Sequence, residues 1–169
     1  MYLLIDIGNS TVVAAIANDN GEILTTWRFD TIKDQTPDYF IDNLMSGLCA
    51  YGIEPSNIDK TAISSVVPEI NGRFVDAVHR ITCVVPRFFS ITDAERLLDI
   101  DVDFPEQVGK DRLADAITAV EYYATPTIFI DMGTATVISV TDKDGCFKGG
   151  VIYPGVTVSL NALSQNAAQ

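Results

Sequence analysis

The stretch LLIDIGNSTV at residues 3–12 returns as a near copy, IFIDMGTATV, at residues 128–137. Each copy has the pattern of a buried strand that ends in Asp-x-Gly, followed by a tight turn of small residues and a second strand. A constant offset of 125 residues superposes the two copies, with Asp6 on Asp131, Gly8 on Gly133, Thr11 on Thr136 and Val12 on Val137. The repeat predicts two related halves that face one ligand.

The residues of the two turns suit a bound nucleotide. Glycine allows the backbone to approach a phosphate closely, so that N–H groups and Ser or Thr hydroxyls converge on its oxygens. An aspartate at the strand exit would repel phosphates unless a cation lay between them, so each Asp implies a metal ion or its waters. For either copy alone, a hairpin turn without a ligand is the alternative. Two copies of the turn with the same hydroxyl-bearing residues favour a nucleotide-binding site over a hairpin turn without a ligand.

Composition and charge exclude several classes of function. The chain has 169 residues, 47% of them hydrophobic, and a net charge of −12, which argues against a nucleic-acid partner. Three scattered cysteines without a CxxC pair favour reduced packing residues of a cytoplasmic protein. His79 is the only histidine, which argues against Ser-His-Asp and metal-histidine chemistry. With no signal sequence and no long apolar run, we expect a soluble, cytoplasmic protein without a membrane partner.

Apolar periodicity predicts three strands and a helix twice over. The first copy has the order βββαβαβ, with strands at 2–7, 11–17, 22–29, 61–67 and 83–85 and helices at 37–52 and 68–80. A loop and connector follow at 90–110, and then a helix at 111–123. The second copy is incomplete, with strands at 127–131, 136–141 and 146–152 and a helix led by Pro154 and Gly155. We therefore expect a first domain over 1–110 and a linking helix with an incomplete second domain over 111–169.

The segment GKDR at residues 109–112 lies at the start of a predicted helix, where the helix dipole favours anions. Arg112 can bind a substrate carboxylate with two hydrogen bonds. Asp111 can accept a proton from a substrate hydroxyl, as the aspartate of kinases does. The alternative for Asp111 is an ordinary first-turn acid paired with Arg112 or Lys110.

A second informative segment is GGVIYPG at residues 149–155. Its paired glycines allow another backbone or a ligand to come close, and Pro154 fits the first turn of a helix. A bulge followed by a helix start is the alternative interpretation. The pair Tyr122-Tyr123 is interpreted as packing aromatics.

Four segments in this order resemble the type III pantothenate kinase family of the actin and sugar-kinase superfamily: DIGNST at 6–11, PEQVGKDR at 105–112, DMGTAT at 131–136 and GGVIYPG at 149–155. The resemblance implies an α/β fold, an actin-like (ribonuclease H-like) duplicated domain. It also implies ATP-dependent phosphorylation of pantothenate to 4'-phosphopantothenate, the first step of coenzyme A biosynthesis. The implied enzyme is a homodimer that uses Mg²⁺ and a monovalent cation, K⁺ or NH₄⁺.

The resemblance also implies roles for single residues. The first ATP phosphate loop would comprise Asp6, Ile7, Gly8, Asn9, Ser10, Thr11, Val12 and Val13, with Asp6 holding the divalent metal through water. Gly133 and Thr134 would contact ATP, and Asp131 would bind the monovalent cation. Asp111 would be the catalytic proton acceptor, and the pantothenate pocket would be lined by Gly109, Lys110, Asp111 and Arg112. Val102 stands where the family usually has a tyrosine against pantothenate, and Val137 stands where it usually has a threonine.

The family continues beyond the helix that follows Pro154, so the resemblance implies that this chain is truncated or split. We then expect an unpaired sheet edge, uncovered apolar faces and little kinase turnover by the chain alone. A second hypothesis is a catalytically impaired remnant that binds only a nucleotide or a partner. A third is another small-molecule kinase or a phosphohydrolase of the same superfamily.

Overall fold

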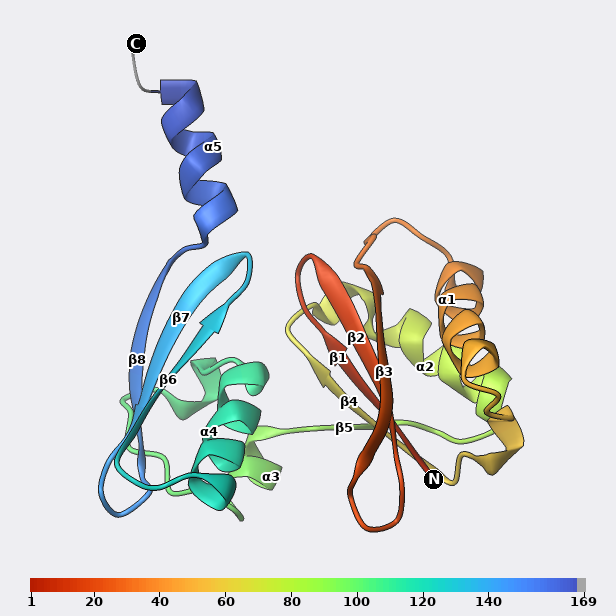
Figure 1. Cartoon of the computed structure of the whole chain (residues 1–169), viewed down its shortest axis with the longest axis horizontal. Coiled ribbons are helices and arrows are strands. Elements are labelled where there is room, and N and C mark those ends of the chain that lie inside the picture. Colours follow the sequence, from red (N-terminus) through yellow and green to blue (C-terminus); the bar gives the residue numbers. More distant parts are fainter. Residues whose placement is uncertain (167–169) are drawn as a thin grey trace. The chain divides into compact units, whose positions relative to one another are not determined.

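Two β-sheets organise the chain, one in each of two units (Figure 1). The computed structural model describes residues 1–166 and separates unit 1, Met1–Phe89, from unit 2, Ser90–Gln169. The connector at residues 90–109 therefore groups with unit 2. The predicted division into domains at residue 110 stays a prediction.

Unit 1 is a five-stranded sheet with helices against one face, as Figure 1 shows. The sheet has the order β3-β2-β1-β4-β5, with strands β1 (Tyr2–Ile7), β2 (Thr11–Ala17), β3 (Ile23–Asp30), β4 (Lys60–Ser65) and β5 (Arg87–Phe88). The helices are α1 (Pro37–Ala50) and α2 (Asn71–Thr82), with short 3₁₀ turns at Pro55–Asn57 and Pro68–Ile70. β1 pairs antiparallel with β2 and parallel with β4. The predicted antiparallel meander is confirmed.

The core of unit 1 lies between the sheet and the two helices. Every second side chain of β1 points inward, and Leu3, Ile5 and Ile7 are at most 3% exposed. They belong to one apolar cluster with Phe40 of α1 and Phe74 of α2, whose ring centroids lie 4.3 Å apart. The apolar repeat of β1 therefore meets matching helical stripes.

The predicted strand at residues 83–85 is wrong. Cys83 ends α2 in the left-handed conformation, with φ of 60°, and the strand β5 begins only at Arg87. Pro86, which lacks an N–H to donate, comes directly before β5. The packing role expected for the cysteines is also wrong for Cys49 and Cys83, which are exposed.

Unit 2 contains a three-stranded antiparallel sheet, the meander that the sequence predicts. Its order is β6-β7-β8, with strands β6 (Thr127–Met132), β7 (Ala135–Thr141) and β8 (Phe147–Pro154). The helices are α3 (Ile91–Ala94), α4 (Lys110–Tyr122) and α5 (Val156–Asn166), with a 3₁₀ turn at Pro105–Gln107. α3 was not predicted, although Ser90 and Asp93 form a capping box at its start. Pro154 ends β8 and does not open the last helix, so that expectation is wrong.

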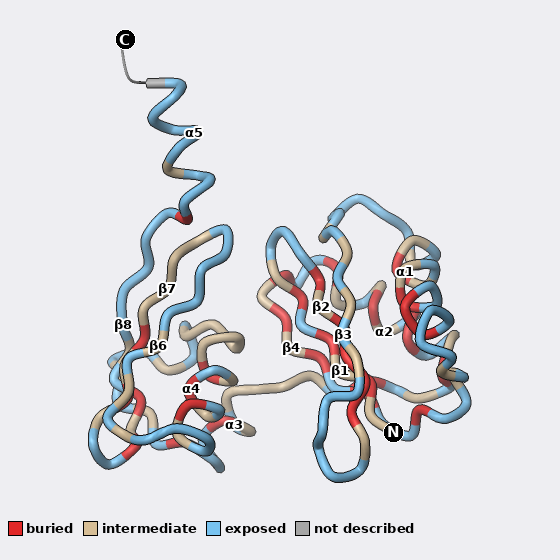
Figure 2. Tube along the Cα trace, in the orientation of Figure 1, coloured by how far each residue is buried: buried red, intermediate tan, exposed pale blue. Residues whose placement is uncertain are grey.

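One face of the β6-β7-β8 sheet is covered by α4 and the other is open. α4 packs its buried residues Leu113, Ala116 and Ala119 toward the sheet. On β6 the side chains of Ile128, Ile130 and Met132 are exposed, in contrast to those on β1 and β2 (Figure 2).

The sequence repeat is present in the structure, but its offset changes at the first turn. Ile7 lies opposite Val12, whereas Met132 lies opposite Thr136, so the second turn is one residue shorter. From there on, equivalent residues are 124 apart. The superposition of Thr11 on Thr136 and Val12 on Val137 is therefore wrong, and the equivalent pairs are Thr11 with Ala135 and Val12 with Thr136.

The turns between the second and third strands confirm the new offset. Asn18 Oδ1 accepts the N–H groups two and four residues further along, at 2.9 and 3.0 Å. Asp142 Oδ1 accepts the N–H groups at the same two positions, both at 3.0 Å. Each turn ends on a glycine with φ of 82°, Gly21 in unit 1 and Gly145 in unit 2. The duplication therefore extends to the hydrogen bonds of the turns.

Candidate active site

The first Asp-x-Gly loop joins β1 to β2 in unit 1. The Gly8 N–H donates to the Thr11 carbonyl at 3.1 Å and closes the turn. A side chain on Gly8 would place Cβ 3.0 Å from that carbonyl oxygen, so the tight turn favours glycine. Asp6, Asn9 and Ser10 are exposed around the turn, as is Thr11. The loop thus presents a carboxylate, an amide and two hydroxyls on a hydrogen-bonded turn.

A residue after β3 holds this loop in place. The Thr31 N–H donates to the Ser10 carbonyl at 3.0 Å, and Thr31 Oγ1 donates to the Gly8 carbonyl at 2.7 Å. Ile7 and Val12, on either side of the turn, are fully buried. Any contact between those two residues and a ligand would therefore involve the backbone alone.

The second loop joins β6 to β7 and is held by an equivalent backbone hydrogen bond from the residue after its third strand. The Gly133 N–H donates to the Ala135 carbonyl at 2.9 Å, and the Gly155 N–H donates to the Thr134 carbonyl at 2.9 Å. A Cβ on Gly155 would lie 2.3 Å from the Gly133 oxygen and 2.5 Å from the Thr134 oxygen, which explains the glycine. Asp131 and Thr134 are exposed.

The segment of residues 149–155 makes close backbone contacts, one of the roles that its glycines predict. Besides Gly155, Gly150 lies so near β7 that a Cβ would stand 1.9 Å from the Ile138 carbonyl oxygen. The register of β7 and β8 shifts at this place, between Ser139 and Thr141, so the predicted bulge is also present.

The GKDR segment forms the N-terminus of α4, where Gly109 is the N-cap residue. Asp111 Oδ1 accepts the Arg112 N–H at 2.8 Å. A Cβ on Gly109 would lie 2.3 Å from the same oxygen, so the carboxylate rests against the glycine backbone. A carboxylate in the first turn of a helix is favoured by the helix dipole. Lys110, Asp111 and Arg112 are all half-buried.

Arg112 is held by residues that the sequence did not single out. Its Nε–H donates to Ser139 Oγ at 3.2 Å, and its guanidinium carbon lies 5.6 Å from the centroid of the Phe147 ring. Its Nη2 is buried, with no hydrogen-bond partner within residues 1–166. Burial lowers the pKa of Arg112, and the charge of Asp111 acts in the opposite direction. The guanidinium thus has donor capacity left for an anionic ligand.

The connector brings Val102 to the same strand. The Phe147 N–H donates to the Asp99 carbonyl at 2.8 Å, and the Asp101 N–H donates to the Phe147 carbonyl at 2.9 Å. Val102 Cγ1 then lies 3.3 Å from where a Cβ of Gly149 would be. Val102 and Arg112 therefore both lie beside the first residues of β8.

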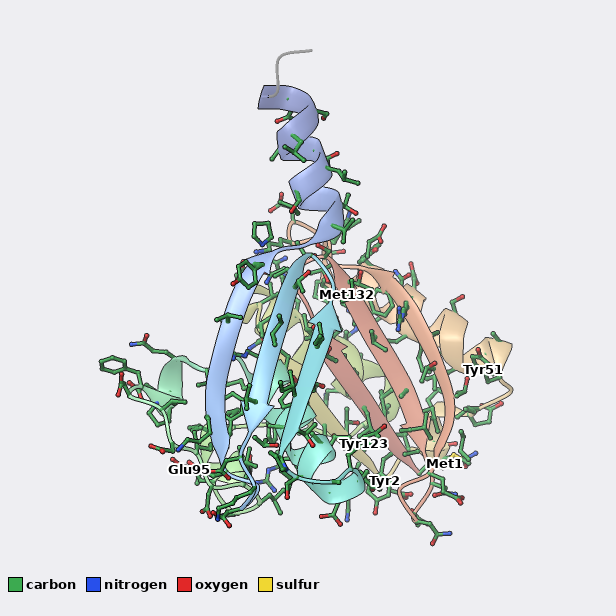
Figure 3. All side chains as sticks on the ribbon, turned by 60° about the vertical axis from the view of Figure 1, so that its left-hand side comes forward. Met1, Tyr2, Tyr51, Glu95, Tyr123 and Met132 are labelled. Atoms are coloured by element: carbon green, nitrogen blue, oxygen red, sulfur yellow. The ribbon has the colours of Figure 1, made fainter. Side chains whose placement is uncertain are left out.

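A groove of about 440 Å³ runs between α4 and β6 in unit 2. Its lining includes Asp115 and Thr118 of α4, the segment Thr127 to Asp131 of β6, and Tyr123. Tyr122 and Tyr123 are 77% and 70% exposed, so their interpretation as packing residues is wrong. Figure 3 labels Tyr123 just after α4 and Met132 at the end of β6.

Residues 1–166 contain neither a cluster of metal-ligating side chains nor a membrane-spanning helix. No group of three or more His, Cys, Asp or Glu side chains there is arranged to hold a metal ion. No helix in the same residues is long and apolar enough to cross a membrane.

Comparison with known sequences gives the family. The profile described as type III pantothenate kinase matches residues 2–169. The chain belongs to this family. Type III pantothenate kinases of Thermomicrobium roseum and Desulforapulum autotrophicum are both 37% identical to it, over 170 and 171 residues. That of Listeria monocytogenes is 33% identical over 175 residues. The whole chain matches each relative but spans only 64% of the relative's length.

Solved structures confirm the fold. A Sinorhizobium meliloti protein assigned as a 2-dehydro-3-deoxygalactonokinase matches 99% of this chain with 57% of its own, at a TM-score of 0.54 and 15% identity. The Aquifex aeolicus Ppx/GppA phosphatase matches 99% with 56% of its own, at a TM-score of 0.51 and 14% identity. The predicted α/β, actin-like duplicated fold is confirmed, with a second sheet smaller than the first.

Proposed function

We propose that this chain carries the phosphate loops and the pantothenate-binding residues of a type III pantothenate kinase. The reaction transfers the γ-phosphoryl group of ATP to the primary hydroxyl of pantothenate and gives 4'-phosphopantothenate, the first step of coenzyme A biosynthesis. The observation that carries the proposal is the pair of Asp-x-Gly loops in a chain of this family. Equivalent hydrogen bonds hold them, from Thr31 in unit 1 and from Gly155 in unit 2.

The loops supply the groups that ATP requires. Backbone N–H groups and the side chains of Asn9, Ser10 and Thr11 would bind phosphate oxygens in unit 1, and Gly133 with Thr134 would do so in unit 2. Asp6 and Asp131 are exposed carboxylates at strand ends, and their hard oxygens fit Mg²⁺ and a K⁺ or NH₄⁺ ion respectively. Bound Mg²⁺ would neutralise phosphate charge.

The N-terminus of α4 supplies the groups that pantothenate requires. Arg112 would bind the carboxylate, with Val102 forming part of the pocket wall. As the pantothenate hydroxyl oxygen bonds to the γ-phosphorus, the bond to the bridging oxygen of ADP breaks, and Asp111 accepts the hydroxyl proton. Gly109, which has no Cβ, leaves room for that carboxylate, and Lys110 would line the same pantothenate pocket.

The wider setting is also a proposal. We propose a homodimer that works in the cytoplasm without a nucleic-acid or membrane partner. The net charge of −12 supports the absence of nucleic acid. An assay of the purified chain by light scattering would give its oligomeric state.

A binding module without catalysis is the second candidate. The open face of the β6-β7-β8 sheet favours it, because an uncovered apolar face of this kind is typical of an interaction surface. In that case the loops would bind a nucleotide, and pantothenate would not be phosphorylated.

ATP turnover with and without pantothenate tests the first proposal. We expect a turnover that is low but requires pantothenate, and a further fall of roughly 10²- to 10⁴-fold in Asp111→Asn, because the proton acceptor is lost. Glu121→Gln, an exposed acid on the same helix, is the matched control and should leave turnover unchanged. Binding of MgATP without pantothenate-dependent turnover would favour the binding module. Absence of MgATP binding would contradict both candidates.

A further inference from the structure

We propose that Ser139 and Phe147 are positioning residues that hold the Arg112 guanidinium so that its two terminal nitrogens meet a ligand carboxylate end-on. The inference deepens the proposed function and rests on it for the identity of the ligand. Neither residue belongs to any of the four motifs that resemble the family. Both lie in unit 2, on β7 and β8.

The contacts fix the guanidinium from two directions. Ser139 is 1% exposed and Phe147 is fully buried, so neither can follow a mobile arginine into solvent. Ser139 Oγ accepts the Nε–H, and the Phe147 ring stands beside the guanidinium at cation–π distance. The hydrogen bond at Nε and the ring beside the guanidinium together restrict its orientation.

The remaining donors define what can bind. A carboxylate pairs with a guanidinium either side-on, through Nε and one Nη, or end-on, through both Nη groups. The bond to Ser139 uses Nε and leaves the end-on mode. Nη2 is buried without a partner within residues 1–166, which is costly for a charged donor unless a ligand satisfies it. Because the Ser139 hydroxyl carries no charge, it anchors the arginine without neutralising it.

The internal repeat gives independent support. At the offset of 124, Ser139, Phe147 and Gly150 of unit 2 correspond to Ala15, Ile23 and Thr26 of unit 1. Ala15 pairs with Thr26 as Ser139 pairs with Gly150, so the backbone is conserved while the side chains differ. Unit 1 has an apolar side chain at each of the two positions that contact Arg112. The hydroxyl and the ring are thus features of unit 2 alone, the unit that contains the arginine.

Hydrogen exchange of the Arg112 Nε–H, followed by ¹⁵N NMR of the whole chain, tests the anchor without any assay of activity. We expect Ser139→Ala to speed this exchange several-fold and Ser139→Thr, which keeps the hydroxyl, to restore it. Thr141→Val is the matched control, because Thr141 is fully buried on the same strand and its hydroxyl has no partner within residues 1–166. Equal exchange in the wild type and Ser139→Ala, or equal acceleration in Thr141→Val, would overturn the proposal.

Calorimetric titration tests whether Arg112 recognises the carboxylate of the ligand. The two ligands are pantothenate and pantothenol, in which a hydroxymethyl group replaces the carboxylate. Ser139→Ala should raise the Kd for pantothenate by roughly five- to tenfold, the worth of one ordinary hydrogen bond, and leave that for pantothenol unchanged. Phe147→Leu, which keeps apolar bulk, should act in the same direction. An unchanged Kd for pantothenate would refute the positioning role while the proposed function stood. Failure of the wild type to bind pantothenate would count against the proposed function, and the exchange experiment would still decide the anchor.

Discussion

The same face of the sheet is buried in unit 1 and open in unit 2. Leu3, Ile5 and Ile7 of β1 are 0%, 3% and 0% exposed, whereas their equivalents Ile128, Ile130 and Met132 of β6 are 67%, 58% and 70% exposed. The two strands have nearly the same apolar pattern. The pattern of a strand therefore specifies which face is apolar, and other elements decide whether that face is buried.

The covering elements differ between the units. In unit 1, α1 and α2 lie over the face, and β4 pairs with the second edge of β1. In unit 2, α5 follows β8 as α1 follows β3, but its apolar residues Val156, Leu160 and Leu163 remain exposed. Among residues 1–166, no strand pairs with the second edge of β6. An unpaired edge beside an open apolar face is the outcome that the sequence predicts for unit 2.

Replacement of equivalent isoleucines should give the largest difference between the units. Ile5→Ala creates a cavity in the core of unit 1 and should lower its free energy of unfolding by about 2–5 kcal/mol. Ile130→Ala removes a side chain that is already exposed and should change that of unit 2 by less than about 0.5 kcal/mol.

Two probes separate the units in a urea titration. Trp27 is the only tryptophan, so its fluorescence reports unit 1, and amide exchange on β6 and β7 reports unit 2. A cost for Ile130→Ala as large as that for Ile5→Ala would show that the face of unit 2 is covered in solution, and the comparison would fail.

The contact of α1 with the sheet should give the second-largest effect on the free energy of unfolding. Trp27 of β3 lies against Gly47 of α1, where a Cβ would fall 2.1 Å from the indole ring. Gly47→Ala should therefore overpack unit 1 and cost about 1–3 kcal/mol. Gly72→Ala in α2 is the matched control, because no atom lies within 4 Å of its Cβ position, and alanine there should stabilise the helix by up to about 1 kcal/mol. If Gly47→Ala and Gly72→Ala shifted the Tm in the same direction, the packing explanation would be refuted.

The strands and long helices could be predicted from the sequence because each depends on local periodicity. The meanders, α1 and α4 follow from apolar spacing, Pro37 and Gly109. β5 could not be placed, because two residues beside a parallel neighbour have no periodicity of their own. The shorter second turn was equally hidden, since Thr11 and Val12 match Thr136 and Val137 at an offset of 125. The shift to 124 shows in the pairing of Met132 with Thr136.

The candidate site divides in the same way. Asp6, Gly8, Gly109, Asp111 and Arg112 belong to short motifs, so the sequence could single them out. Ser139 and Phe147 reach Arg112 only through the pairing of β7 with β8 and the packing of α4, which no local pattern contains. A serine in a strand otherwise rich in apolar residues was the one available signal. The ligand roles of all these residues stay predictions.

The smallest expected effect concerns the two equivalent turns, which Asn18 caps in unit 1 and Asp142 in unit 2. The N–H of Cys146, and to a lesser degree that of Asp144, lowers the pKa of Asp142 below its ordinary value of 3.8. A lowered folded-state pKa adds stability above the unfolded value, and this stability is lost as the pH falls through the folded pKa. Unit 2 should therefore lose turn stability below about pH 4, while the amide of Asn18 gives unit 1 no such dependence.

Asp142→Asn, which gives unit 2 the amide that Asn18 gives unit 1, should reduce the loss of unit 2 stability at acid pH. Thermal unfolding of unit 2 between pH 2 and pH 6 measures it, with Asp144→Asn as control because that carboxylate contacts Lys143. If Asp142→Asn kept the full acid sensitivity, the carboxylate would not be its source. The difference between the turns would then be one of sequence without energetic consequence.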